Sequence, residues 1–487
     1  MAILRVRGAG CLFSRAEESN ELSTVKAHAE ETPSAASLQN AATATTKAAL
    51  EVALDEGESM RVQECAVAYA AALVSHLENA GRTSLPPAGT YTEPEAIFKA
   101  LEATTTAIAP VKLLRASWVI ARAAKLKAAA PAERAGLALP RRQQLEAEEP
   151  SAFLSLTELK ALPREHNPEN PSKQGKLALG CASYCWLTPE HPDPTGEQLI
   201  ALADAIVALQ SGERAFPREA GIFIDFASLC QKDEHGERTP DEKAAFGVAL
   251  GGMQLWYASS LATTFMLRSL PPGWEALTGY DGRGWPTCES LWAALIKMNA
   301  SGHGAVQYSD PIVDVGAPQG AYRRPPPLSP QAMASRVALR RFTSAKADLP
   351  MVIRLNTITM LSAFADVREL RYRGLGWDAA DVTRLAEVLP LCRQLTWLGL
   401  AQNQMGDDGA AAIAHALTCM KAPLHTLMLP NNGIGDAGAI ALAEAFGTTT
   451  MPLVKVDLAR NGGIGEAAQH RLRDAAAAVP SLTQVLF

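Results

Sequence analysis

The 487-residue sequence has little of what would place a chain in a membrane or on nucleic acid. No apolar run approaches the roughly 20 residues that a helix needs to cross a bilayer, and the longest apolar helical segment, 65–74, is short and alanine-rich. The formal net charge is -6, with 45 basic against 51 acidic residues, so the basic footprint of nucleic-acid binding is missing. We therefore expect neither a membrane nor a nucleic acid as a partner.

Metal and disulfide signals are also lacking. The eight cysteines are scattered, no C-x-x-C pair occurs, and no cysteine–histidine cluster has zinc spacing. We expect no metal, and we interpret Cys181 and Cys185, near a predicted strand, as packing thiols. The default setting is a reduced one, and we expect a cytoplasmic protein. An alternative location is an organelle, because Arg5, Arg7 and Arg15 precede the first acid, Glu17. The absence of a G-x-x-x-x-G-K-[S/T] motif excludes a P-loop ATPase.

The first third of the chain divides by composition into three segments. Residues 1–46 are rich in Ala, Ser, Thr and Glu without an apolar period, and we expect them to be disordered. Residues 47–130 carry apolar residues at helical spacing and predict a helical region. Residues 131–175 are rich in proline and charge, which indicates an irregular connector.

Strand and helix patterns alternate in residues 176–300. Strands are expected at 177–186, 221–226 and 262–267, and helices at 196–209, 241–257 and 286–298. This alternation predicts an α/β fold, with a mostly parallel sheet covered by helices on both faces. Ligands of such sheets bind outside the carboxyl ends of the strands, which is the edge where Ser183 and Asp225 are expected.

The last part of the chain repeats. Leu395, Leu424, Leu453 and Leu482 follow one another at intervals of 29 residues, and the first three open the pattern L-x-x-L-x-L-x-x-N, with Val456 at one leucine position. Residues 367–487 resemble ribonuclease-inhibitor-like leucine-rich repeats, which imply an arc with one strand and one helix per unit. The spaced leucines fill the core, and the Asn side chain can bond to backbone groups at the turn.

The repeats predict a protein-binding surface. The outward strand positions, on the concave face, include Trp397, Met428, Lys455 and Asp457, and this face is the natural partner surface of repeat proteins. The alternative for Trp397 is packing against a neighbouring domain of the same chain. Ahead of the repeats, residues 318–330 indicate a Pro-rich linker, and 331–366 a helical or mixed connector. With about three full units, we expect the arc to lean on the preceding domain.

Three spaced motifs in the central region carry a second resemblance. They are Asp225-x5-Gln231-x-Asp233, Met253-x3-Tyr257-Ala258 and Arg283-x-Trp285-x3-Glu289. Their order and spacing resemble those of the heterokaryon-incompatibility (HET) domain, which is related in fold to the Toll/interleukin-1 receptor (TIR) domain. The resemblance covers residues 177–295 and implies a TIR-like sheet.

The TIR resemblance implies a possible substrate. Some members of that family cleave NAD at the nicotinamide–ribose bond, and the matching catalytic carboxylate here is Glu289. A carboxylate can stabilise the oxocarbenium-like charge that forms when nicotinamide departs. The residues expected to bind a ligand are Ser183, Asp225, Gln231, Arg283 and Trp285. The alternatives are structural, because the helix dipole alone favours an acid in the first turn and Arg283 can pair with Asp225 or Asp233.

Together these patterns predict a signalling or defence-type protein. Its repeats would bind a protein partner, and its central module would act through self-association, as a homo-oligomer, or through nucleotide turnover. The two alternatives are an NAD glycohydrolase that uses Glu289 and a non-catalytic scaffold.

Overall fold

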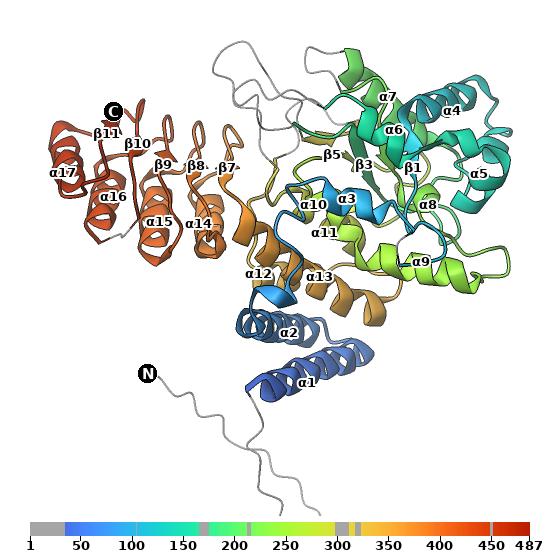
Figure 1. Ribbon diagram of the computed structural model, residues 1–487, viewed down its shortest axis with the longest axis horizontal. Helices are drawn as coiled ribbons and strands as arrows, with labels where there is room; N and C mark the ends of the chain where they lie inside the picture. Colours follow the sequence, from blue (N-terminus) through green and yellow to red (C-terminus); the bar gives the residue numbers. More distant parts are fainter. Residues whose placement is uncertain are drawn as a thin grey trace, which may run out of the picture.

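The computed structural model describes residues 35–103, 105–164, 175–211, 216–297, 311–316, 323–448 and 451–487. The arginines near the N-terminus and residues 318–322 of the expected linker lie outside these ranges. Figure 1 shows an α/β part with helices beneath it and an arc of repeats extending to one side. None of the described helices combines the length and apolar character needed to span a bilayer.

A six-stranded sheet forms the centre of the α/β part. Its strand order is β2 (Phe153–Leu154), β1 (Leu113–Arg115), β4 (Gly221–Phe223), β3 (Leu179–Tyr184), β5 (Thr263–Leu267) and β6 (Ile312–Asp314). The pairs β4–β3, β3–β5 and β5–β6 are parallel, whereas β1 pairs antiparallel with both β4 and β2. The parallel-rich sheet predicted from the alternating patterns is therefore present.

Both faces of this sheet are covered, as its apolar strands require. Ala182 and Tyr184 of β3 pack on one face with α7 (Glu197–Ser211) and α4 (Ala116–Ala128). Leu179 and Cys181 face the opposite core, which holds α10 (Met253–Ala258) and α11 (Gly284–Ala293). The alternation along β3 follows from the two-residue period of a strand.

The helix expected at 241–257 is two helices. The structure has α9 (Pro240–Gly251) and α10, separated at Gly252. Glycine disfavours a helix interior, and the Gly251-Gly252 pair lies where the helix ends. The second expected strand is also shorter than predicted, because the chain turns into the short helix α8 (Asp225–Ser228) directly after β4.

The segment expected to be a connector, 131–175, instead contributes to the α/β part. It supplies β2, α5 (Arg142–Glu148) and α6 (Leu156–Ala161). The side chain of Arg142 is fully buried, and its guanidinium donates to the carbonyl oxygens of Ala109, Pro110 and Ser228. The charge-rich sequence therefore did not mark a solvated loop here, because backbone carbonyls satisfy the guanidinium inside the protein.

The helices at the N-terminus do not form a unit of their own. The helices α1 (Ala35–Glu56) and α2 (Ser59–Ala80) pack with α12 (Pro330–Ala338) and α13 (Ala345–Asp366). Gln63 Nε2 donates to Ser335 Oγ over 2.6 Å, and Lys346 Nζ lies 2.8 Å from Asp55 Oδ2. The first part of the expected helical region, up to Ala80, and the expected connector 331–366 thus form one bundle. The later part of that region is not purely helical, because it supplies β1 and α4 to the α/β part. Residues 35–46, expected to be disordered, belong to α1.

The remaining short elements join these parts. The helix α3 (Glu95–Ala100) precedes β1, and the 3-10 segments are η1 (Arg82–Ser84), η2 (Arg134–Leu137), η3 (Pro150–Ala152), η4 (Tyr280–Gly282) and η5 (Leu389–Leu391).

The repeats form a five-stranded parallel sheet with one helix after each of its first four strands. The strands are β7 (Glu369–Arg371), β8 (Trp397–Gly399), β9 (Thr426–Met428), β10 (Lys455–Asp457) and β11 (Gln484–Leu486). The helices are α14 (Ala379–Val388), α15 (Gly406–Cys419), α16 (Asp436–Thr448) and α17 (Glu466–Ala477). Figure 1 shows the helices in one row and the strands in another.

The repeat asparagines bond to the backbone as predicted. Asn432 Nδ2 donates to the carbonyl oxygens of Leu400 and Leu429, so it joins two successive units. Asn403 and Asn461 make the equivalent pairs of bonds. Each asparagine therefore satisfies carbonyl groups at the point where the strand ladder stops.

The described part of the expected linker, 323–330, is packed against the protein. Arg324 is 4% exposed and donates to the carbonyl oxygen of Ala294 over 2.8 Å. Trp377 Nε1 donates to the carbonyl oxygen of Arg324 over 2.7 Å, and the Tyr372 hydroxyl bonds to the carbonyl oxygen of Leu295. The arc leans on the preceding helices, because its first unit shares their apolar core.

Candidate functional site

A buried polar cluster lies at the carboxyl end of β3. The hydroxyl of Ser183 donates to Glu289 Oε2 over 2.5 Å, and it shares a second 2.5 Å hydrogen bond with the hydroxyl of Tyr280. Ser183 comes from β3, Glu289 from α11 and Tyr280 from η4. Three elements that are separate in the sequence therefore bring their polar groups together inside the core.

Asp225 lies at the end of the neighbouring strand. Its carboxylate accepts hydrogen bonds from the Tyr184 hydroxyl, from Trp186 Nε1 at 3.0 Å and from the Phe226 backbone N–H at 2.7 Å. Ser183 and Tyr184 are consecutive residues of β3, and their side chains leave opposite faces of the sheet. Glu289 and Asp225 are thus bonded by two adjacent residues, Ser183 and Tyr184, on opposite faces of the sheet.

The environment of Glu289 favours its neutral form. The side chain is 6% exposed, and burial raises its pKa from 4.5 to about 8. This value includes the opposing effects of hydrogen bonds with Ser183 and Tyr257, which lower the pKa, and of the negative charge of Asp225, which raises it. Burial also raises the pKa of Asp225, against the hydrogen bonds from Tyr184, Trp186 and Phe226. At neutral pH the cluster therefore holds a proton on Glu289.

The other residues expected to bind a ligand have structural contacts. Arg283 Nε donates to the carbonyl oxygen of Thr278 over 2.9 Å. In the part of the chain that the structure describes, Arg283 bonds to neither Asp225 nor Glu289. Gln231 Nε2 donates to the carbonyl oxygens of Asp225 and Leu229, which braces the loop after α8. Trp285 packs its ring 6.5 Å from that of Trp292 and bonds to Asp348 of α13, so it faces the helical bundle.

Three tyrosines complete the cluster, and the sequence did not single them out as site residues. Tyr280 and Tyr184 bond to Ser183 and Asp225 respectively, and Tyr257 donates to the carbonyl oxygen of Ala182 over 3.0 Å. Of the three, Tyr184 was the easiest to find from the sequence, because it directly follows Ser183 at the strand end. Tyr280 lies in a Gly-Tyr-Asp-Gly turn, which carries no functional signature.

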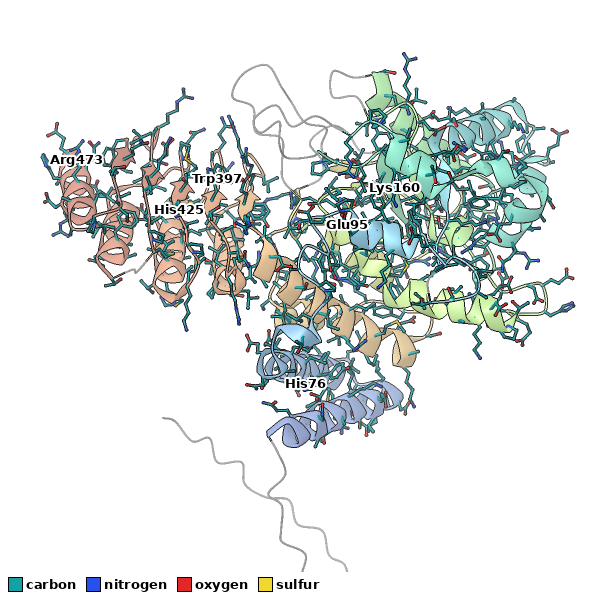
Figure 2. All side chains as sticks on the ribbon, in the orientation of Figure 1. His76, Glu95, Lys160, Trp397, His425 and Arg473 are labelled. Atoms are coloured by element: carbon teal, nitrogen blue, oxygen red, sulfur yellow. The ribbon has the colours of Figure 1, made fainter. Side chains whose placement is uncertain are left out.

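The strands of the repeats present two rows of outward side chains. Strand register aligns Glu369, Trp397, Thr426, Lys455 and Gln484 in one row, and Arg371, Gly399, Met428, Asp457 and Leu486 in the other. All four residues predicted for this surface, Trp397, Met428, Lys455 and Asp457, are half-buried and belong to these rows. Figure 2 places Trp397 and His425 in the arc.

Trp397 packs against residues of its own repeats. Its indole lies over Gly399, where any Cβ atom would overlap the ring. The guanidinium of Arg371 lies 4.7 Å from the ring centroid, and its Nη2 is 3.3 Å from Glu369 Oε2. The cation–π contact and the glycine together keep the indole flat against the strand face.

The described residues contain no group of three or more His, Cys, Asp or Glu side chains placed to hold a metal ion. Comparison with known families matches the Leucine Rich repeat family at residues 392–414 and 422–443, and it detects no HET or TIR domain in the central region. None of the curated proteins matches the sequence. The repeats thus imply binding to other proteins.

Proposed function

We propose that this chain is a signalling or defence-type protein whose strand face in the repeats binds a protein partner. The observation that supports this is the half-exposed indole of Trp397, fixed over Gly399 and beside Arg371. Tryptophan and arginine are enriched among the residues that dominate binding energy at protein interfaces. A rigid aromatic anchor also loses little conformational entropy when it binds.

The face also carries charges of both signs that can select a partner. Lys455 and Asp457 flank the buried Val456 on β10, while Arg371 and Glu369 flank Leu370 on β7. Charges at the rim of an interface affect specificity and the association rate more than affinity. We propose a partner whose surface places an apolar group against Trp397 and complementary charges beside it.

The test is affinity capture with the full chain and three variants. Trp397→Ala and Lys455→Glu are expected to lose the same set of captured proteins. The matched control is Lys421→Glu, an equal charge reversal at an exposed residue between α15 and β9. Capture that survives both strand-face changes, or that is lost equally in the control, would refute the proposal.

A second candidate is nucleotide turnover in the HET/TIR-like central module, and one observation favours it. The order β4–β3–β5 places a switch point beside β3, and Ser183 and Glu289 lie at its carboxyl end. Ligands of open parallel sheets bind at such switch points. NAD would have to reach a carboxyl group that is 6% exposed and release its proton, so this candidate requires an opening of the cluster.

Incubation of the full chain with NAD tests this candidate. Release of free nicotinamide that disappears in Glu289→Gln would support it. If nicotinamide release is unchanged in the variant, or if no nicotinamide is released even when the partner is bound, the enzyme candidate fails. The central module would then be a self-associating or scaffold element.

A further inference from the structure

A cavity of about 500 Å³ lies where the first repeat meets the helical bundle. Its walls come from the packed, described part of the expected linker, 323–330, from α12 and from α14. This volume is within the range of small-molecule sites. The region is separate from the Ser183–Glu289 cluster and from the strand face of the repeats.

The cavity lining carries more positive than negative charge. Its lining contains four arginines against two acids, and these residues are Arg323, Arg324, Arg336, Arg384, Asp381 and Glu387. Asp378 lies outside the lining but pairs with Arg323 Nη2 at 3.3 Å, so four positive charges face three negative ones and the formal excess is one positive charge. The arginines reach the cavity from three parts of the chain, the segment 323–328, α12 and α14, so the excess is created by the fold and not by a single basic run in the sequence.

Asp381 holds two of these arginines in place. Its Oδ2 accepts a hydrogen bond from Arg323, and its Oδ1 accepts one from Arg384 Nη1 over 3.0 Å. The carboxylate is 10% exposed, whereas each of the two arginine side chains is 50% exposed. A guanidinium has five N–H donors, so each can hold Asp381 and also reach a ligand.

The remaining wall is apolar. Pro325, Pro326 and Leu328 line the cavity beside the arginines. Rigid rings and a branched side chain of this kind can cover the flat face of a ligand without donating hydrogen bonds. A cavity with one charged side and one apolar side suits a ligand that has a charged part and an apolar part.

We infer that this cavity binds an organic phosphate of the nucleoside diphosphate type, with its phosphate groups on the arginines and its nucleoside on the proline wall. The planar guanidinium fork matches phosphate oxygens in pairs, which a point charge cannot do. Such a ligand bridges α12 of the bundle and α14 of the first repeat. Its binding therefore fixes the repeat arc against the bundle.

Calorimetric titration of the full chain at low salt tests this inference with three probes: ADP, inorganic pyrophosphate and adenosine. We expect ADP to bind best, pyrophosphate to bind more weakly, and adenosine to bind least. Loss of one charged hydrogen-bond donor corresponds to about a 10-fold or greater loss of affinity. Arg384→Ala and Arg336→Ala are therefore each expected to weaken ADP binding by about that factor.

The matched control is Arg393→Ala, which removes an exposed arginine in the loop after η5, away from the cavity lining. Arg384→Lys keeps the charge without the fork and is expected to bind ADP with intermediate affinity, and its circular dichroism spectrum reports whether it folds. The inference is overturned if neither ADP nor pyrophosphate binds. It is also overturned if adenosine binds as well as ADP, or if Arg393→Ala weakens binding as much as Arg384→Ala.

Discussion

Ser183 and Glu289 are 106 positions apart in the sequence and are joined by a 2.5 Å hydrogen bond inside the core. The bond links the carboxyl end of β3 to the middle of α11. It satisfies a hydroxyl and a carboxyl group that would each be costly to bury alone. The same bond therefore explains both how α11 is placed on the sheet and why a titratable acid is tolerated there.

Glu289 is expected to make folding stability fall as the pH rises. Its pKa is raised to about 8 in the folded state, from 4.5. Between these values the folded state binds more protons than the unfolded state, so stability decreases by at most about 1.4 kcal/mol per pH unit. Its contribution is fully present below pH 4.5 and is lost above pH 8. Urea unfolding of Glu289→Gln should show a flatter profile from pH 5 to 8, and an unchanged slope would contradict this account.

Lys297 is expected to act in the opposite direction at higher pH. The side chain is fully buried, donates to the carbonyl oxygens of Ser259 and Ala262, and has a pKa lowered by burial from 10.5 to about 7. Between these values the unfolded state binds more protons, so stability rises with pH. Lys297→Met should remove that alkaline rise in urea unfolding. The exposed Lys243→Met serves as the control, and an equal change in both variants would count against the prediction.

Gly399 is expected to control the position of Trp397. A Cβ atom at Gly399 overlaps the indole, so Gly399→Ala should displace the ring from the strand face and expose it. Acrylamide quenching of tryptophan fluorescence should increase, and partner capture should weaken as in Trp397→Ala. Gly447→Ala is the matched control, because a Cβ there meets nothing within 4 Å. Unchanged quenching in Gly399→Ala would show that the indole has room to adjust in place.

Asn432 is expected to be important for the stability of the repeats. It is 1% exposed and donates to the carbonyl oxygens of Leu400 and Leu429. Asn432→Ala removes one of the two amide donors to each carbonyl, because Asn403 Nδ2 also donates to Leu400 and Asn461 Nδ2 also donates to Leu429. The loss of two buried hydrogen bonds costs about 1–3 kcal/mol. The loss should appear as a lower urea midpoint, whereas Gln394→Ala at an exposed turn should change it little. A midpoint equal to that of the control would mean that water replaces the amide.

The repeats were predictable because their signal is local and periodic. Each leucine of the pattern is buried wherever it occurs, and each asparagine meets the same two carbonyl positions, so one unit predicts the next. The strands β3 and β5 were also predictable, since each is a largely apolar run between turn signals. The main error was in the predicted lengths of the strands. At β4, for example, the turn into α8 begins earlier than the apolar run suggests.

The candidate site was less predictable, because it depends on contacts between distant segments. The sequence predicted that Ser183 and Asp225 would lie at the carboxyl ends of neighbouring strands, which they do. It gave no means to foresee that Trp285 would turn toward Asp348, or that Arg142 would be buried beneath three carbonyls. In each case the partner is far away in the chain, and only packing selects it.

The pairing of α1 and α2 with α12 and α13 has a consequence for synthesis of the chain. The helix α2 ends at Ala80, and α12 begins at Pro330, so 250 positions separate them. At about 5–20 residues per second, the ribosome needs roughly 10–50 s to make that stretch. During this interval the apolar faces of the first two helices have no completed counterpart, which makes them natural clients for chaperones that bind nascent chains.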